Sequence, residues 1–106
     1  MRIIVMGTGP FAVQMLEAIL ADGHDVPVVV TRPLPPARGR KKPPVNPLRE
    51  AANQHGLTLL DPADVNTADV VAELANLQAD LLVVCDFGQI LSPAALGVTP
   101  LGGINL

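Results

Sequence analysis

The sequence has a single cysteine, Cys85, among its 106 residues. One cysteine cannot form an intramolecular disulfide, and no cysteine cluster is present that could ligate zinc. Only five apolar residues precede Gly7, too few for a signal-peptide core or a membrane span. We therefore expect a cytoplasmic protein with no metal and no membrane partner.

Aromatic residues are almost missing, since tryptophan and tyrosine are absent and phenylalanine occurs twice. The chain is nevertheless 49% hydrophobic, which argues against a disordered tail. Its core must be built from Val, Leu, Ile, Met and Ala, a composition typical of a buried parallel sheet. Its length suits a single compact domain.

Acidic residues are absent between Arg32 and Arg49, although the chain has ten of them and a net charge of −3. That stretch of 18 residues holds six of the seven Lys and Arg. We call residues 32–46 the basic segment. Because its first part, RPLPPARGRKKPPV, has no hydrophobic period and contains five prolines, it predicts a loop that cannot bury its charges.

The basic segment could neutralise several phosphates of a nucleic acid, or it could be a solvated linker. Connections within a βαβ unit usually take about two to six residues. The greater length of this one favours a functional role.

Short apolar runs alternate with helical patterns over the rest of the chain. Strands are expected at residues 2–6, 26–31, 57–60, 80–85 and 103–106. Helices are expected at residues 10–22, at 47–55, from a cap at Asn66 or Thr67 through Leu77, and as a single turn at 93–96. This alternation predicts an α/β fold, a doubly wound, Rossmann-like and mostly parallel sheet with helices on both faces. The short last strand suggests that the domain is incomplete.

A glycine turn, Gly7-x-Gly9-x-x-Ala12, joins the first strand to the first helix and matches the dinucleotide-binding fingerprint. The acidic residue that would hold a ribose hydroxyl is missing, but Arg32 could hold the 2′-phosphate of NADP. Pro10 removes a backbone N–H that a pyrophosphate would use, which favours a simple tight turn. An NADP-binding module stays the alternative.

Few side chains suggest chemistry by themselves. Asn105, at the end of the last strand, could polarise a carbonyl oxygen or serve as a turn residue. Asp86 could bind a ligand or cap a turn, and the sequence does not decide between these. Ser92 is the only serine and is expected to cap a helix, which leaves no nucleophile for a Ser-His-Asp hydrolase.

Four segments taken in order resemble the methionyl-tRNA formyltransferase family. They are MRIIVMGTGPFA, ARGRKK with the later NPLRE, VVCDFGQIL, and GGINL. The resemblance spans the whole chain. Glycinamide ribonucleotide formyltransferase is similar in fold but has no comparable basic segment.

The resemblance implies transfer of a formyl group from 10-formyltetrahydrofolate to the amino group of methionyl-initiator tRNA. Asn105 would polarise the formyl oxygen as a catalytic residue. The folate side would include Phe87, Gly88, Gln89, Ile90 and Leu91, and the tRNA contacts would come from Arg38, Arg40, Lys41 and Lys42. No metal is implied, and the family is monomeric.

The same resemblance places residues 1–106 in the amino-terminal portion of the catalytic domain, with the basic segment inserted. A catalytic His and Asp would lie beyond Leu106, so the 106-residue chain alone is expected to be inactive.

Two departures from the family pattern matter. Arg38-Gly39-Arg40-Lys41-Lys42 replaces the usual G-R-G-K-K, which leaves open which arginine contacts tRNA. Asp86 stands where the family has a small residue, so the formyl acceptor could instead be another amine, such as an amino sugar nucleotide.

Overall fold

The structure is a computed structural model that describes residues 1–35, 39 and 45–106. Within these residues the elements are β1 (Ile3–Gly7), α1 (Pro10–Ala21), β2 (Val29–Val30), α2 (Pro47–Gln54), β3 (Leu59–Leu60), α3 (Ala68–Asn76), β4 (Leu81–Cys85), α4 (Pro93–Leu96) and β5 (Gly103–Asn105).

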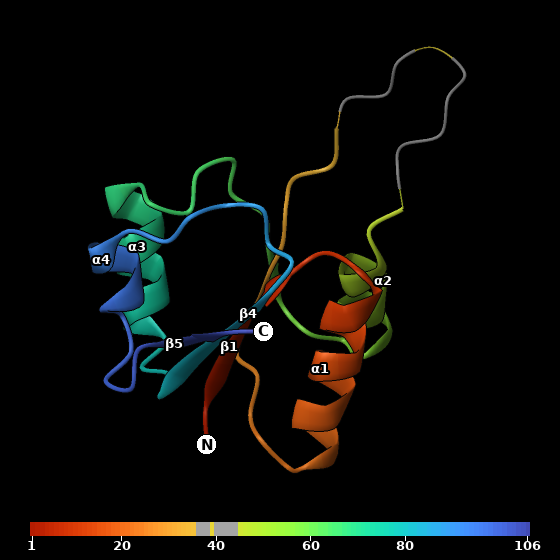
Figure 1. The fold of residues 1–106 in the computed structure, drawn as a ribbon, viewed down its shortest axis with the longest axis horizontal. Helices are drawn as coiled ribbons and strands as arrows, with labels where there is room; N and C mark the ends of the chain where they lie inside the picture. The colour runs from red at the N-terminus through yellow and green to blue at the C-terminus, as the bar shows by residue number, and fades with distance from the viewer. Residues whose placement is uncertain (36–38, 40–44) are drawn as a thin grey trace.

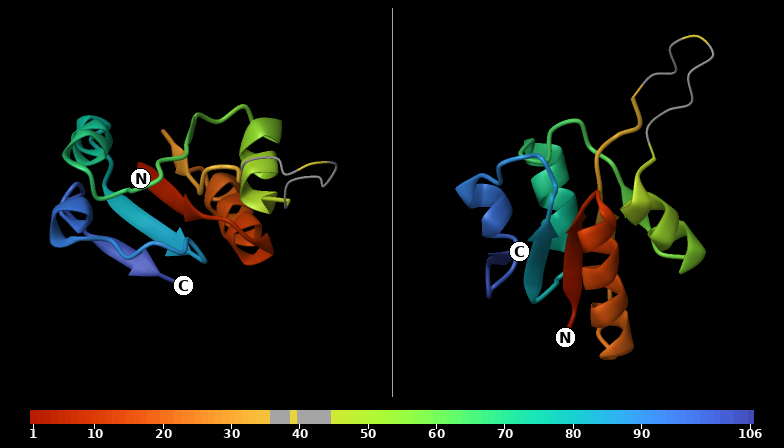
Figure 2. Two further views of the ribbon diagram at one scale, coloured as in Figure 1. Left: turned by 90° about the horizontal axis from the view of Figure 1, so that it is seen from above. Right: turned by 45° about the vertical axis from the view of Figure 1, so that its right-hand side comes forward.

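The strands form one parallel sheet in the order β3-β2-β1-β4-β5. Helices α1 and α2 cover one face, and α3 and α4 lie on the other (Figure 1). Figure 2 shows the same three layers from above, with β1 and β4 at the centre. The predicted doubly wound, Rossmann-like fold is confirmed.

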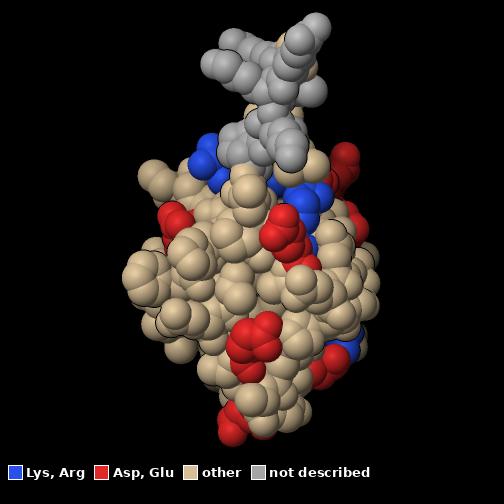
Figure 3. Space-filling view, turned by 90° about the vertical axis from the view of Figure 1, so that its right-hand side faces the viewer, with Lys and Arg blue, Asp and Glu red and all other residues tan. Residues whose placement is uncertain are grey.

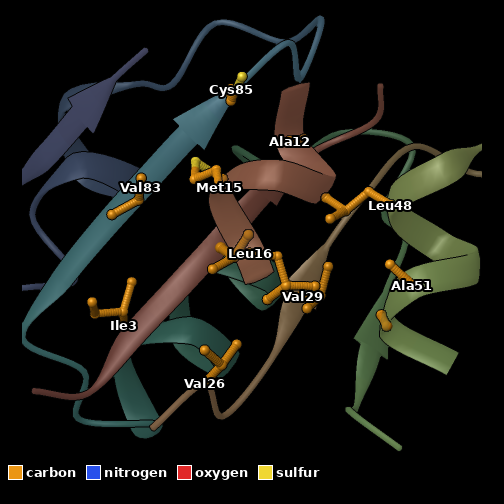
Figure 4. Packing of buried hydrophobic residues seen from close by; sticks show 12 residues of the cluster. Ile3, Ala12, Met15, Leu16, Val26, Val29, Leu48, Ala51, Val83 and Cys85 are labelled. Carbon is orange, nitrogen blue, oxygen red and sulfur yellow. The ribbon is translucent and has the colours of Figure 1, made fainter. Parts of the chain in front are cut away.

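The core consists of two apolar layers, one on each face of the sheet. Along β1, Ile3 and Val5 point to the α1 and α2 face, while Ile4 and Met6 point to the α3 face. Figure 4 shows the first layer, in which Leu16 and Leu48 meet the sheet from α1 and α2. This aliphatic packing explains how the chain forms a core with almost no aromatic residues.

Two strands lose two or more residues relative to the sequence prediction, while the runs at 80–85 and 103–106 each lose only one. The run at 26–31 gives only Val29–Val30, because Pro27 has no N–H to place in the ladder, although Val26 and Val28 stay buried. The run at 57–60 gives only Leu59–Leu60, since the Leu57 amide donates to the Ala52 carbonyl at the end of α2 (2.9 Å).

The helix caps follow the sequence closely. The Asn46 side chain accepts the Arg49 amide (3.0 Å), and Ser92 accepts the Ala95 amide (3.1 Å). Of the two candidates for α3, Thr67 is the cap. Asn66 instead holds the chain after β4, where it donates to the Ile90 carbonyl (2.8 Å) and accepts the Ser92 amide (2.8 Å).

Candidate functional site

The carboxyl ends of the parallel strands lie along one edge of the sheet, the edge where ligands bind in open α/β folds. Such strand ends are followed by the Gly7–Pro10 turn, by the chain after Cys85 and by the start of the basic segment, and Asn105 is the last residue of β5. The far end of the segment reaches the same place because the Asn46 side chain donates to the hydroxyl of Thr31, just after β2 (2.8 Å). The described ends of the basic segment and Asn105 therefore share this edge. The strand order separates β2 from β5 by three strand spacings, about 14 Å.

The glycine turn is shaped by close packing. A Cβ on Gly7 would lie 2.3 Å from the Cys85 carbonyl oxygen and 2.7 Å from the Ala12 Cβ, so only glycine fits there. Gly9 is the N-cap of α1, which receives no side-chain cap. The tight-turn explanation of the motif thus has a structural cause that needs no nucleotide.

Asp86 lies directly over this turn. Its Oδ2 is 2.6 Å from where a Cβ on Gly9 would sit, and its carbonyl accepts a hydrogen bond from the Thr8 hydroxyl (2.6 Å). The residue has a left-handed backbone, with φ of +53°. A carboxylate in this position repels a pyrophosphate approaching the start of α1, which argues against a dinucleotide there.

The Phe87–Leu91 segment divides into buried and exposed parts. Phe87 packs into the core layer on the α3 face, and the Gln89 side chain bonds the Val65 amide (2.8 Å) and the Pro62 carbonyl (3.2 Å). The Ile90 side chain, by contrast, is 90% exposed. Gly88 has φ of +82°, and the Arg32 guanidinium lies 3.0 Å from the position of its missing Cβ.

Asn105 meets this segment around one cavity. A hollow of about 330 Å³ is lined by Gln89, Ile90, Leu91, Leu96 and Asn105, among others. The Asn105 side chain is exposed. Its position in the sheet is fixed by the parallel register with Val84, whose carbonyl accepts the Leu106 amide (2.8 Å). The cavity thus joins three of the predicted folate-side residues to the predicted catalytic amide.

The four cations predicted to contact tRNA, Arg38, Arg40, Lys41 and Lys42, lie outside the described residues. The described ends of the basic segment border a cavity of about 530 Å³, lined by Thr8, Gly9, Arg32, Leu34 and Asn46 with neighbouring prolines. Figure 3 shows basic side chains on this part of the surface, with acidic side chains scattered over the same face.

Arg49, one of the six cations between residues 32 and 49, is less accessible to a polyanion than the sequence suggests. The Arg49 side chain is only 17% exposed and pairs with Asp61 (2.7 Å). Although the sequence groups Arg49 with these charges, most of its side chain is covered by the protein. Its guanidinium pairs with the half-exposed carboxylate of Asp61, which the linear charge pattern does not bring near it.

Sequence reasoning also missed two polar contacts behind the site. Thr31 is fully buried and donates to the Gly7 carbonyl (2.7 Å), and its hydroxyl accepts the Asn46 side-chain amide (2.8 Å). A threonine at the end of an apolar strand gives no sign in the sequence that it bonds to a distant turn.

Within the described part of the chain, no group of three or more His, Cys, Asp or Glu is placed to bind a metal ion. Across the same residues, no helix has the length and apolar character needed to cross a membrane.

Comparison with known proteins identifies the class. The family model described as Formyl transferase matches residues 1–106, and the chain belongs to this family. The resemblance seen in the sequence is thus confirmed at the level of the family.

Two relatives are methionyl-tRNA formyltransferases. The one from Rhodopirellula baltica is 51% identical over 110 residues, covering 100% of this chain and 33% of the relative. The one from Symbiobacterium thermophilum is 46% identical over 107 residues, covering 100% of this chain and 32% of the relative. The chain spans about a third of the length of the curated relatives it matches.

A solved structure supports the fold. Phosphoribosylglycinamide formyltransferase from Bacillus halodurans superposes with a TM-score of 0.70 at 16% identity, covering 99% of this chain and 55% of that one.

Proposed function

We propose that this protein takes part in translation initiation, as a cytoplasmic enzyme that transfers the formyl group of 10-formyltetrahydrofolate to the amino group of methionyl-initiator tRNA. The observation that carries the proposal is the arrangement at the carboxyl edge. Asn105 shares a cavity with Gln89, Ile90 and Leu91, and the basic segment begins and ends at the same edge.

In this proposal the Asn105 amide acts on the reacting carbonyl. The amino nitrogen of methionine attacks the formyl carbon, and its lone pair forms the new C–N bond while the carbonyl oxygen gains negative charge. An amide N–H donated to that oxygen stabilises the tetrahedral state more than the substrate. The bond from the formyl carbon to the folate nitrogen then breaks, and its electron pair stays on that nitrogen, which takes up a proton as the attacking nitrogen loses one; the products are formyl-methionyl-tRNA and tetrahydrofolate.

The binding roles are part of the same proposal. The folate side is assigned to residues 87–91, with Ile90 and Leu91 offering apolar surface at the cavity and Phe87 supporting the segment from the core. The tRNA phosphates are assigned to Arg38, Arg40, Lys41 and Lys42. The proposed chemistry uses no metal.

The NADP alternative is weaker on this geometry. Asp86 places a carboxylate against Gly9, and the Arg32 guanidinium lies on Gly88 at the edge of the folate-side segment. The alternative in which the formyl acceptor is another amine, such as an amino sugar nucleotide, keeps one supporting observation. Asp86 adds an exposed negative charge beside the Gly7–Pro10 turn.

Ligand protection separates the folate and NADP proposals. We expect a non-reactive 10-formyltetrahydrofolate analogue to raise the melting temperature of the chain and NADPH to leave it unchanged, since a ligand that binds only the folded state stabilises it by mass action. At about a hundredfold over its Kd, the analogue should add roughly 2.7 kcal/mol. Protection by NADPH alone would favour the dinucleotide module, and Ile90→Asp should reduce the folate effect without changing the fold.

A further inference from the structure

The segment proposed to contact folate, residues 87–91, has no regular secondary structure, and we call it the folate segment. Among the described residues, its backbone forms no hydrogen bond with another backbone group. Phe87 fixes its start in the core, whereas Ile90 is largely exposed. A loosely held segment loses conformational entropy when a ligand orders it, so its contacts with side chains determine how far it is ordered in the free protein.

Gln89 bonds the folate segment to the loop between β3 and α3. Its side-chain oxygen accepts the Val65 amide (2.8 Å), and its side-chain nitrogen donates to the Pro62 carbonyl (3.2 Å). Val65 is fully buried in the core layer on the α3 face. The middle of the folate segment is therefore tied to a part of the loop that the core holds in place.

Asn66 makes the reciprocal contact from the loop. Its side-chain nitrogen donates to the Ile90 carbonyl (2.8 Å), and its side-chain oxygen accepts the Ser92 amide (2.8 Å). These two bonds bracket Leu91, which lines the cavity shared with Asn105. One side chain thus fixes the backbone on both sides of a residue that faces the proposed site.

The conformation of Asn66 is itself fixed. Its backbone amide donates to the Asp64 carboxylate (2.9 Å), and the next residue, Thr67, caps α3. Asn66 therefore joins the folate segment to a loop that is held by a helix and by the buried Val65 side chain. Asn66 is not among the described residues that line the cavity, so any effect on a ligand there passes through the folate segment.

We infer that Asn66 is a positioning residue for folate binding: it holds the backbone on both sides of Leu91, so that Ile90 and Leu91 line the cavity before the ligand arrives. This inference rests on the proposed function. Because the folate segment is ordered in advance, less conformational entropy is lost when the ligand binds.

The test measures the Kd of a non-reactive 10-formyltetrahydrofolate analogue for the 106-residue chain and its variants, well below the melting temperature of each. Asn66→Ala is expected to raise the Kd about tenfold. If only about one molecule in ten then has the segment in its binding conformation, the apparent Kd rises by the reciprocal of that fraction. Asn66→Asp should also weaken binding, since it keeps an acceptor for the Ser92 amide but places an oxygen against the Ile90 carbonyl.

Thr67→Ala is the matched control for a general loss of stability. Thr67 accepts the Val70 amide within α3 (3.3 Å), so its replacement also removes a hydrogen bond between a side chain and the backbone. It should lower the melting temperature and leave the Kd unchanged. An unchanged Kd for Asn66→Ala, or an equal rise for Thr67→Ala, would overturn the positioning role.

A double-mutant cycle shows whether Asn66 acts through the folate segment. Ile90→Ala should raise the Kd in the original chain and have a smaller effect in the Asn66→Ala chain, because the released segment no longer holds residue 90 at the ligand. Fully additive effects would contradict the inference.

Hydrogen exchange in the unliganded chain tests the contact without any ligand. Asn66→Ala should speed exchange of the Ser92 amide about tenfold, whereas Thr67→Ala should leave it unchanged, because protection falls where a local contact is lost. Unchanged exchange in Asn66→Ala would overturn the positioning role. If the unsubstituted chain binds no folate analogue, the assignment of residues 87–91 to folate, and with it the proposed function, is what fails.

Discussion

Replacing Asn105 with alanine is expected to lower kcat for formyl transfer by about a hundred- to a thousandfold, the loss typical of removing one donor to a developing oxyanion. The measurement uses a hybrid enzyme in which residues 1–106 replace the matching third of the Rhodopirellula baltica relative. Because the amide acts mainly on the transition state, kcat and kcat/KM should fall together while KM for the folate changes little.

Asn76→Ala is the control for that experiment. Asn76 is the exposed last residue of α3. It lies near the amino ends of the strands, whereas Asn105 lies at their carboxyl ends. Its loss should leave kcat unchanged. A hybrid carrying Asn105→Ala that is folded and retains normal kcat would remove Asn105 from the catalytic role proposed for it.

Neutralising the four cations of the basic segment is expected to weaken binding of initiator tRNA and to flatten its salt dependence. With Arg38, Arg40, Lys41 and Lys42 all replaced by glutamine, the slope of log K against log salt should fall by roughly three, because each lost phosphate contact accounts for about 0.7 to 0.9 of that slope. Binding isotherms at several salt concentrations measure it directly.

Arg2→Gln is the control for losing a positive charge elsewhere on the protein. Arg2 lies at the amino end of β1, away from the basic segment, and pairs with Asp25. It should change the slope little. If the fourfold variant kept the original slope, the basic segment would be a linker and the proposed tRNA contacts would be wrong. If the slope does fall, single replacements of Arg38 and of Arg40 show which arginine contacts the tRNA.

The fold was predictable because its signals are local. Apolar runs such as Leu81–Cys85 form buried strands, and Asn46 and Ser92 cap helices through atoms only three residues away. The errors arose where a local pattern competes with a distant partner. The run at 57–60 lost part of its strand when the Leu57 amide bonded to the end of α2.

The site was predictable only in part. The sequence places Asn105 and residues 87–91 at strand ends, and parallel topology then brings them to one edge. The roles of Arg49 and Asn66 depend on partners 12 to 26 residues away in the chain, which no periodicity reveals. Residue type alone grouped Arg49 with the cations expected to face solvent, although its side chain is only 17% exposed and pairs with Asp61.

Formyl transfer itself provides the most direct test of the central claim. The hybrid enzyme is supplied with labelled 10-formyltetrahydrofolate and with either methionyl-initiator tRNA or an amino sugar nucleotide, and the 106-residue chain alone is the expected inactive control. The account predicts label on the methionine amino group of the tRNA and none on the sugar. Label only on the sugar, or none on either acceptor from a folded hybrid that binds the folate, would contradict it.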